Sequence, residues 1–345
     1  MDRVVKGKTG QYRGAMKKIA IGHGSGGRLT RELIEEIFLK HLRSDELKPL
    51  EDAATVELQT RKTAVTTDSY VVRPLFFPGG DIGKLSVYGT VNDLLVSGAV
   101  PAYLSLGVIL EEGFPVDRLE DILKSIARAS AESGVRVVTG DTKVVEKDRC
   151  DGVYINTTGM GELIRPMSLS NVSAGDAVIV TGTAGDHGTA IALARHDFGI
   201  DSRVESDCAS LKDLLVPLFH AEGLKWMRDP TRGGLATVLA ELSRATGLGV
   251  EVSEKRIPVR EDVRFISDML GYDPLYLASE GRAVVVAAAE SAAGILGMLK
   301  RHPLGANAAV IGNITGRFRG VRLKTSIGGE RLLEMLDEEL LPRIC

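Results

Sequence analysis

The chain has 345 residues and a mass of 36.9 kDa, about twice the usual domain length of ~150 residues, so we expect two domains with substantial cores. Hydrophobic residues make up 44% of it and charged residues 26%, with 39 glycines and 12 prolines, which excludes disordered and collagen-like proteins. The 43 basic and 46 acidic residues leave a net charge of −3, so no overall field attracts nucleic acid or an anionic membrane.

Residues 1–17 form a basic extension ahead of the first predicted domain. Residues 1–18 carry six basic side chains and one acidic side chain but no apolar stretch, which is not the pattern of a secretory signal peptide. We therefore expect an arm that lies outside the domains, and a protein that stays in the cytoplasm.

Helix and strand patterns alternate over 18–165 and predict a mixed α/β domain. Apolar residues at helical spacing predict two helices, over 29–42 and 116–127. Runs rich in β-branched residues predict four strands, over 64–67, 102–110, 135–139 and 153–163. The polar, turn-rich stretch 168–175 then predicts a linker.

The second half repeats this pattern and predicts another α/β domain over 173–325. Its predicted strands lie at 177–181, 250–252, 283–289 and 308–314, and a helix with one apolar face spans 235–242. The run 283–289 is the longest apolar stretch, far below the ~20 residues that cross a bilayer. The predicted fold class is therefore α/β or mixed α+β, with no membrane span.

The last predicted segment is 330–345, where an amphipathic pattern over 330–341 predicts a helix that Pro342 ends. The residues after this helix form a short extended tail with Cys345 at its end. Five extended residues reach at most ~16–18 Å, so the tail can visit a neighbouring cleft but cannot cross a domain.

Glycine-rich segments offer two kinds of phosphate site, and the sequence favours neither. The segment 22–27 has the spacing G-x-G-x-x-G, but only three apolar residues precede it and no second strand follows promptly, so a dinucleotide fold is not supported. Gly83-Lys84 is followed by Leu85 and Gly7-Lys8-Thr9 lacks the first glycine, so neither completes a Walker A motif. A bound nucleotide would not use a P-loop.

Four aspartates recur at strand exits and glycine turns: Asp52, Asp68, Asp93 and Asp141. Any one of them alone is more simply interpreted as a turn or cap residue. Together near a triphosphate they would repel it, unless hard cations such as Mg²⁺ bridge carboxylate and phosphate oxygens. The segment 229–234 opens a predicted helix whose glycine N–H groups and Arg232 could face an anion, or could form a plain helix start with a solvated arginine.

Two charged residues stand out by their position beside these turns. Lys143 follows Asp141 by two residues, and Glu280 directly precedes the apolar strand. A lysine or glutamate at the end of an element is usually a surface residue, so only its position favours a functional role. The histidines have no ligand spacing with a cysteine, so a structural zinc site has no support.

The three cysteines are far apart and form no C-x-x-C pair, which argues against a disulfide framework and favours a reducing compartment. Cys345 is unusual because a terminal cysteine after a proline breaker should be mobile and exposed, whereas cysteines are normally buried. Its own α-carboxylate disfavours the thiolate, so a thiol loaded by a partner is more plausible than a self-activated nucleophile. The alternative is an incidental terminal residue.

The motifs together resemble the HypE family of hydrogenase maturation proteins, within the superfamily of aminoimidazole ribonucleotide synthetase and selenophosphate synthetase. The segments that carry the resemblance are 22–27, 52–54, 67–70, 77–83, 91–94, 140–143, 229–234 and 342–345. The likeness runs from about residue 18 to the last residue and leaves 1–17 outside. The Asn-Asp and Gly-Asp elements are shared across the superfamily, whereas the ending Pro-Arg-Ile-Cys is specific to the HypE family.

The resemblance implies two α/β domains, a homodimer formed through the N-terminal sheets, and ATP bound in clefts near that interface. It implies that the carbamoyltransferase HypF loads a carbamoyl group onto Cys345. ATP then drives dehydration of this thiocarboxamide to a thiocyanate. The cyanide would pass to iron on a HypC–HypD complex, on the way to the centre of a [NiFe] hydrogenase.

The resemblance also implies roles for individual residues. Glu280 would remove the amide proton, Lys143 would position or stabilise the developing charge, and Cys345 would carry the substrate. The expected ATP-binding residues are Gly24, Ser25, Gly26, Gly27, Asp52, Asp68, Asn92, Asp93, Asp141, Thr142 and Arg232. The expected magnesium ligands are Asp52, Asp68, Asp93 and Asp141.

Two alternatives stay open. One is a selenophosphate-synthetase-like or ribonucleotide-cyclising enzyme, but no cysteine lies near the N-terminal glycines, where a selenium enzyme would need one. Neither of these enzymes explains the terminal cysteine. The other alternative is a non-catalytic scaffold that binds nucleotide and uses its tail as a peptide ligand.

Overall fold

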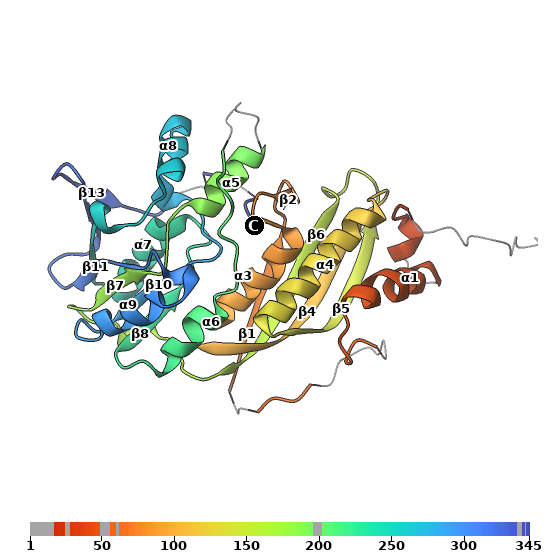
Figure 1. Ribbon diagram of the computed structural model, residues 1–345, viewed down its shortest axis with the longest axis horizontal. Coiled ribbons are helices and arrows are strands. Elements are labelled where there is room, and N and C mark those ends of the chain that lie inside the picture. Colours follow the sequence, from red (N-terminus) through yellow and green to blue (C-terminus); the bar gives the residue numbers. More distant parts are fainter. Residues whose placement is uncertain are drawn as a thin grey trace, which may run out of the picture.

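The computed structural model describes residues 17–24, 28–48, 56–59, 62–195, 202–336, 340–341 and 343–345. The described chain contains two larger β-sheets with helices packed against them, so the predicted mixed α/β class is confirmed (Figure 1). No helix within these ranges has both the length and the apolar character needed to cross a membrane.

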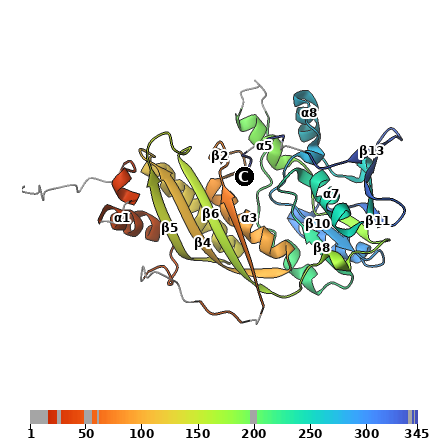
Figure 2. The same ribbon diagram turned by 180° about the vertical axis from the view of Figure 1, so that it is seen from behind.

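The first part of the chain forms a four-stranded sheet in the order β1-β6-β4-β5. Its elements are η1 (Ile21–Gly24), α1 (Arg28–Leu33), η2 (Ile34–Phe38), α2 (Leu39–His41), β1 (Thr63–Tyr70), β2 (Phe76–Phe77), β3 (Gly80–Asp81), α3 (Ile82–Val96), β4 (Ala99–Glu111), α4 (Val116–Ser133), β5 (Arg136–Val145) and β6 (Val153–Leu163). Strand β6 pairs antiparallel with β1 and β4, whereas β4 and β5 are parallel. Figure 1 shows α3 and α4 over one face of this sheet, and Figure 2 shows its opposite face without a covering helix of the described chain.

Helix α3 lies between this sheet and the rest of the molecule, and the sequence analysis did not predict it. Thirteen of its 15 residues are buried, because it packs against the sheet, α4 and the second part of the chain at once. A helix buried on nearly all sides has no polar stripe, so it shows no helical periodicity. Asp81 begins it by accepting hydrogen bonds from the backbone N–H groups of Gly83 and Lys84, at 2.7 and 3.1 Å.

The second part forms a seven-stranded sheet in the order β13-β12-β9-β11-β7-β10-β8. Its elements are η3 (Leu169–Asn171), β7 (Ala177–Val180), α5 (Asp186–Arg195), α6 (Lys212–Leu215), η4 (Val216–His220), β8 (Leu224–Arg228), α7 (Gly234–Thr246), β9 (Gly249–Ser253), η5 (Glu254–Arg256), α8 (Glu261–Leu270), η6 (Pro274–Tyr276), β10 (Val284–Ala287), α9 (Ala292–Lys300), η7 (Pro303–Gly305), β11 (Ala309–Thr315), β12 (Gly320–Lys324) and β13 (Glu330–Leu333). Its central strands are apolar throughout because both faces are covered. Val178 and Val284 belong to the same apolar cluster as α7, whereas Ile179 and Val285 belong to the cluster that includes α9.

The predicted helix over 330–341 is wrong. Residues 330–333 form β13, which pairs antiparallel with β12 from Val321↔Leu333 to Lys324↔Glu330. The turn between the two strands has Gly328 at a φ of 95° and is closed by a hydrogen bond from Thr325 N to Gly329 O (2.8 Å). A glycine turn of this kind favours a hairpin, and it outweighed the helical spacing of the apolar residues.

The C-terminal tail lies along the segment that follows β1. Val71 N donates a hydrogen bond to Cys345 O (3.0 Å), and Arg73 N donates one to Arg343 O (3.4 Å). The Ile344 side chain is only 5% exposed and belongs to an apolar cluster that spans both parts of the molecule. The terminus therefore lies between the two parts of the molecule, beside β2 and α5 (Figure 1), and Cys345 is half-buried where the sequence predicts an exposed residue.

Candidate functional site

A cavity of about 320 Å³ lies where the two parts of the chain meet. Its lining includes five carboxyl groups, two arginines and the terminal cysteine: Asp68, Asp93, Asp229, Glu241, Glu280, Arg228, Arg232 and Cys345. These residues come from β1, α3, β8, the turn between β8 and α7, α7, the segment before β10, and the tail. The cavity thus gathers residues that lie more than 270 positions apart in the chain.

Asp68 and Asp93 are held on the first part of the molecule. Along β1 the even-numbered positions face the helices, so Thr66 Oγ1 donates a hydrogen bond to Asp93 Oδ2 on α3 (2.8 Å) and Asp68 faces the same side. Arg232 reaches across from the turn before α7, with Nη2 at 3.1 Å from Asp68 Oδ1. Because the Arg232 side chain is 71% exposed, this ion pair contributes little stability.

The carboxylates of the cavity raise one another's pKa. Burial is the largest cause for Asp68, followed by the Asp93 carboxylate, and together they raise its pKa to about 6 against the opposing effect of Arg232. Burial, and then the charges of Asp93 and Asp68, raise the pKa of Asp229 to about 7. A cation in the cavity would remove this repulsion, because it favours the ionised form of each carboxyl group.

Glu280 is the most deeply placed of these acids, with 2% exposure. Its backbone is fixed on both sides, since its N–H donates to Asp207 Oδ1 (3.0 Å) and its carbonyl accepts from Asn92 Nδ2 (3.0 Å). Burial, and then the charges of Asp229 and Asp207, raise its pKa well above the usual value. Its Oε1 atom is buried and finds no hydrogen-bond partner within the described chain. Such a carboxylate is a strong base whenever it is ionised.

Asn92, an expected ATP-binding residue, makes its hydrogen bonds within the protein. Its Nδ2 donates to Ala209 O and Glu280 O, both at 3.0 Å, and its Oδ1 accepts from Leu211 N at 2.9 Å. Asn92 is only 1% exposed, so all of these contacts lie inside the protein. Asn92 therefore joins α3 to two segments of the second part, and so orients Glu280 from behind.

A second group of predicted residues lies on β5, at the opposite edge of the four-stranded sheet. Asp141 and Lys143 form an ion pair of 2.8 Å, with side chains 70% and 62% exposed. Thr142 is buried, and Gly24 packs against this strand so closely that a Cβ atom would lie 2.3 Å from Val144 N. Four further predicted residues lie outside the described residues: Ser25, Gly26, Gly27 and Asp52.

Register across the sheet separates the two groups. Asp68 pairs with Thr157, Thr157 with Leu106, and Leu106 with Gly140, the neighbour of Asp141. Three strand spacings amount to ~14 Å between the edges. Lys143 pairs with Ile109, which is 40% exposed, so it lies on the open face, whereas Asp68 lies on the helix-covered face. One chain alone does not bring the two groups together.

The carboxylates of the cavity have the chemistry that a magnesium ion requires. Asp68, Asp93 and Asp229 supply the hard oxygen ligands that Mg²⁺ prefers, and their mutual repulsion favours a cation. Within the described ranges, however, no three His, Cys, Asp or Glu side chains have the arrangement of a preformed metal centre. The residues therefore fit a cation that shares its ligands with a bound phosphate better than one held by protein alone.

Several cavity residues were not assigned a role from the sequence. Asp229 was seen only as part of a helix start, because its depth and its neighbours depend on the tertiary fold. Tyr70 donates or accepts a hydrogen bond with Thr90 Oγ1 (3.0 Å), and burial raises the pKa of its phenol. Gly89 gives this phenol its space, since a Cβ there would lie 2.4 Å from Tyr70 Oη. In the sequence, Tyr70 was singled out only as the last residue of the segment 67–70, without a role of its own.

Comparison with known proteins gives consistent results over nearly the whole chain. Residues 50–163 match the model of the AIR synthase related protein, N-terminal domain, and residues 173–324 match that of its C-terminal domain. Carbamoyl dehydratase HypE of Azotobacter vinelandii is 46% identical over 327 residues, which is 94% of this chain and 96% of that protein. A crystal structure of hydrogenase maturation protein HypE in complex with ATP has a TM-score of 0.91 at 44% identity, covering 94% of this chain and 99% of that one. A crystal structure of a HypE–HypF complex matches with a TM-score of 0.77 at 43% identity, over 88% of this chain and 99% of that one.

Proposed function

The chain belongs to the HypE family of carbamoyl dehydratases, enzymes of hydrogenase maturation, and from this premise we propose that it converts a carbamoyl group on Cys345 into a thiocyanate with ATP as co-substrate. The observation that supports this most is the shared cavity. The terminal thiol lies in the same space of about 320 Å³ as Glu280, whose carboxyl group is buried and has an unsatisfied oxygen. The proposed carrier and the proposed base therefore line the same cavity.

All atoms and protons are accounted for in the proposed reaction of the carbamoyl group with ATP. The carbamoyl oxygen attacks the γ-phosphorus of ATP and ADP leaves, so the oxygen departs with phosphate when the carbon–nitrogen triple bond forms. The nitrogen gives up both of its protons, and Glu280 accepts the one that is lost in the elimination. The products are the Cys345 thiocyanate, ADP, phosphate and a proton. Water must be excluded from this step, and the half-buried position of Cys345 supports that.

ATP is proposed to bind at the carboxylate side of the cavity, where Arg232 and Arg228 also lie. A relative with 44% identity was solved in complex with ATP, which supports this choice of nucleotide. Asp68 and Asp93, with Asp52 and the Asp141 of a second copy as further ligands, would hold Mg²⁺, which when bound neutralises the phosphate charge.

The residues on β5 require a second chain in this proposal. The open face of the four-stranded sheet carries exposed apolar side chains, among them Val65 at 63% and Ile109 at 40% exposure. A homodimer through this face would bury them and could carry Asp141 and Lys143 of one copy to the cavity of the other. Lys143 would then stabilise the negative charge that develops on the transferred oxygen.

Partners follow from the chemistry of the carrier. We propose HypF as the carbamoyl donor, because a relative with 43% identity forms a HypE–HypF complex. An iron-bearing HypC–HypD complex is the proposed acceptor of the cyanide. The cytoplasm is the proposed compartment, because a carrier thiol must stay reduced.

The decisive test is the mass of the C-terminal peptide. After loading by the carbamoyl donor system, addition of ATP should remove one water from the adduct on Cys345, and a Cys345→Ser chain should show neither adduct nor loss. Cleavage after glutamate yields residues 340–345, which isolates Cys345 from Cys150 and Cys208. An adduct that keeps its mass with ATP would favour a scaffold, and an adduct on another cysteine would refute the carrier assignment.

A further inference from the structure

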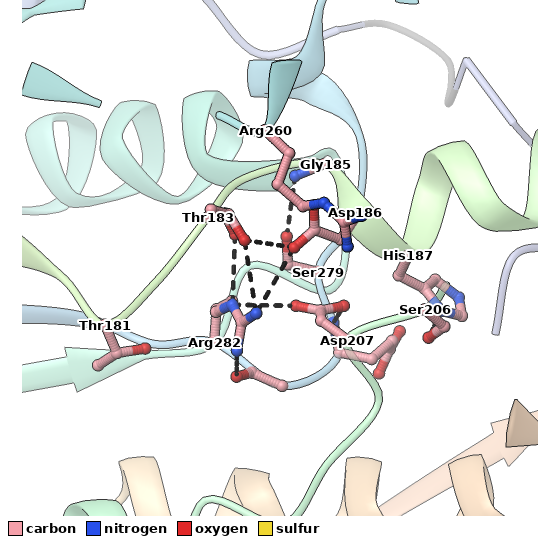
Figure 3. A network of polar contacts seen from close by, with 12 residues as sticks. Thr181, Thr183, Gly185, Asp186, His187, Ser206, Asp207, Arg260, Ser279 and Arg282 are labelled. Atoms are coloured by element: carbon pink, nitrogen blue, oxygen red, sulfur yellow. Dashed lines mark hydrogen bonds and ion pairs between the residues drawn. The ribbon is translucent and has the colours of Figure 1, made fainter. Parts of the chain in front are cut away.

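A network of buried polar side chains lies beneath the tail (Figure 3). Arg282 lies between two aspartates, with Nη2 at 3.5 Å from Asp186 Oδ2 and Nε at 3.5 Å from Asp207 Oδ2. The side chains of the two aspartates are only 2% and 1% exposed. Thr183 Oγ1 also donates to Asp186, so this part of the network is held from several directions. Such a network fixes the backbone on either side of each aspartate.

The residues next to these two aspartates meet each other. His187 follows Asp186 and Ser206 precedes Asp207, and Ser206 Oγ lies 2.7 Å from His187 Nδ1. His187 Nε2 lies 2.9 Å from the backbone oxygen of Ile344, in the tail. The imidazole is fully buried, and the Phe77 ring packs against it at 5.5 Å with an interplanar angle of 85°.

These contacts specify one tautomer of His187. A carbonyl oxygen only accepts, so Nε2 carries the proton that is donated to Ile344 O, and Nδ1 of the neutral ring accepts from the Ser206 hydroxyl. Ser206 Oγ in turn accepts from Cys208 N at 3.1 Å. Burial lowers the pKa of His187 and so keeps the ring neutral. Every polar atom of the Ser206–His187 pair is therefore satisfied while the tail is docked.

The same short segment also holds Glu280. Asp207 Oδ1 accepts from Glu280 N, and Gly281 passes so close that a Cβ atom there would lie 1.9 Å from Asp207 O. The segment that contains Ser206 and Asp207 thus contacts both His187, which binds the tail, and the backbone of Glu280, the proposed base. A shift of the tail is therefore coupled to the position of Glu280 through Ser206 and Asp207.

We propose that His187 and Ser206 are positioning residues that hold the carbonyl of Ile344 and thereby keep the Cys345 thiol in the cavity beside Glu280. The consequence for catalysis rests on the proposed function, whereas the docking of the tail does not. One neutral hydrogen bond is a modest interaction, so the tail can also leave, as loading by a partner requires. The occupant of this site is a segment of the chain itself.

The docking is tested by the reactivity of Cys345 toward iodoacetamide, measured without ATP or any partner. The docked thiol is half-buried, so its alkylation reports how often the tail is released. Loss of one buried hydrogen bond predicts an increase of about fivefold in the alkylation rate of His187→Phe and a smaller increase for Ser206→Ala. His220→Phe, which replaces an exposed histidine of η4, is the matched control and should react like the wild type. Mass analysis of the peptide 340–345 assigns the site, and thermal unfolding shows which variants are folded.

A double-mutant cycle separates positioning from general loosening. Ser206 acts through His187, so Ser206→Ala should add almost nothing in the His187→Phe background. Additive effects, or wild-type reactivity in both folded variants, would overturn the proposal. If His187→Phe does not fold, Ser206→Ala alone decides, because it removes a single hydroxyl and only the bonds of that hydroxyl to His187 Nδ1 and Cys208 N.

The rate of dehydration is a second, separate measurement of the proposal. In a carbamoylated chain, His187→Phe should lower the single-turnover rate of dehydration and leave the ATP concentration for half-maximal rate unchanged, because the variant changes the position of the carrier and not the nucleotide site. A folded His187→Phe chain with faster alkylation but an unchanged dehydration rate would remove the catalytic consequence. Absence of dehydration in the wild type would refute the proposed function and leave the alkylation result standing.

Discussion

Asp68 and Lys143 lie at opposite edges and on opposite faces of the same four-stranded sheet. Asp68 faces the helices from β1, at the cavity that contains Cys345, whereas Lys143 pairs with Ile109 on the open face of β5. A reaction that needs both side chains therefore needs two chains. The exposed apolar residues of the open face are the natural contact surface for the second copy.

Subunit complementation tests this arrangement. Lys143→Ala and Glu280→Gln homodimers should each be inactive, but an equimolar mixture should regain about a quarter of the wild-type activity, since half of its dimers are mixed and each of these has one of two sites intact. The measurement is dehydration per chain after the two variants are unfolded and refolded together. Mixtures that stay inactive, while a mixture with wild-type chains is active, would place Lys143 and Glu280 in the same chain or remove Lys143 from the mechanism.

Glu280→Gln should abolish dehydration while ATP still binds. Glutamine keeps the size of the side chain and the backbone bonds to Asp207 and Asn92, but it cannot accept a proton. We expect a loss of about 10² to 10⁴ in the single-turnover rate, which is the usual contribution of a general base. Glu290→Gln, in an exposed turn, is the control. A rate within a few-fold of the wild type would assign proton transfer to another group.

The sequence predicted an element correctly where the spacing of its apolar residues reflects which of its sides is buried. Strand 153–163 agrees with β6 residue for residue, and the helix over 116–127 lies within α4, because one side of each element is buried and the other is exposed. Helix α3 could not be predicted from periodicity because it is buried on nearly all sides. The segment 330–333 has the apolar spacing of a helix but forms a strand, because the glycine turn before it favours a hairpin with β12.

The candidate site was predicted in part. Asp68, Asp93, Glu280, Arg232 and Cys345 do share one cavity, and the motifs with the resemblance they carry had singled them out. Their separation from Asp141 and Lys143 follows from strand order and register, which no local pattern encodes. No sequence pattern predicted a role for His187, since its contact with Ile344 joins positions 157 residues apart.

Ile344→Ala should release the tail without unfolding the protein. The side chain is 5% exposed within the apolar core, and its burial contributes about 2 kcal/mol, which corresponds to a ~30-fold shift in the docking equilibrium. Amide hydrogen exchange of Val71 is the measurement, because its N–H is bonded to Cys345 O only while the tail is docked. Leu332→Ala, at an exposed position of β13, should leave this exchange unchanged. Equal exchange in the two variants would show that the Ile344 side chain does not hold the tail and that other contacts, such as the Arg343 side chain with Val71 O and Asp151, do.

Asp229 should make the protein less stable as the pH rises from about 4 to about 7. Its pKa is raised from 3.8 to about 7 in the folded state, first by burial and then by the Asp93 charge. In that range the unfolded chain has already lost the proton that the folded chain still holds, so deprotonation favours unfolding. The difference of about three pKa units corresponds to at most ~4 kcal/mol.

Urea unfolding at pH 4.5 and pH 8 measures this effect. Asp229→Asn cannot ionise, so the fall in unfolding free energy between the two pH values should be smaller by a large part of that amount. The neighbouring carboxyl group of Asp68, with a pKa of about 6, adds a decline of the same sign that remains in the variant. Mg²⁺ with a nucleotide should stabilise the wild type more at pH 8 than at pH 4.5, because ligands must be ionised to bind the cation. An identical pH profile for Asp229→Asn and the wild type would show that Asp229 ionises as freely in the folded chain as in the unfolded one, and would remove the electrostatic argument for a cation at this cavity.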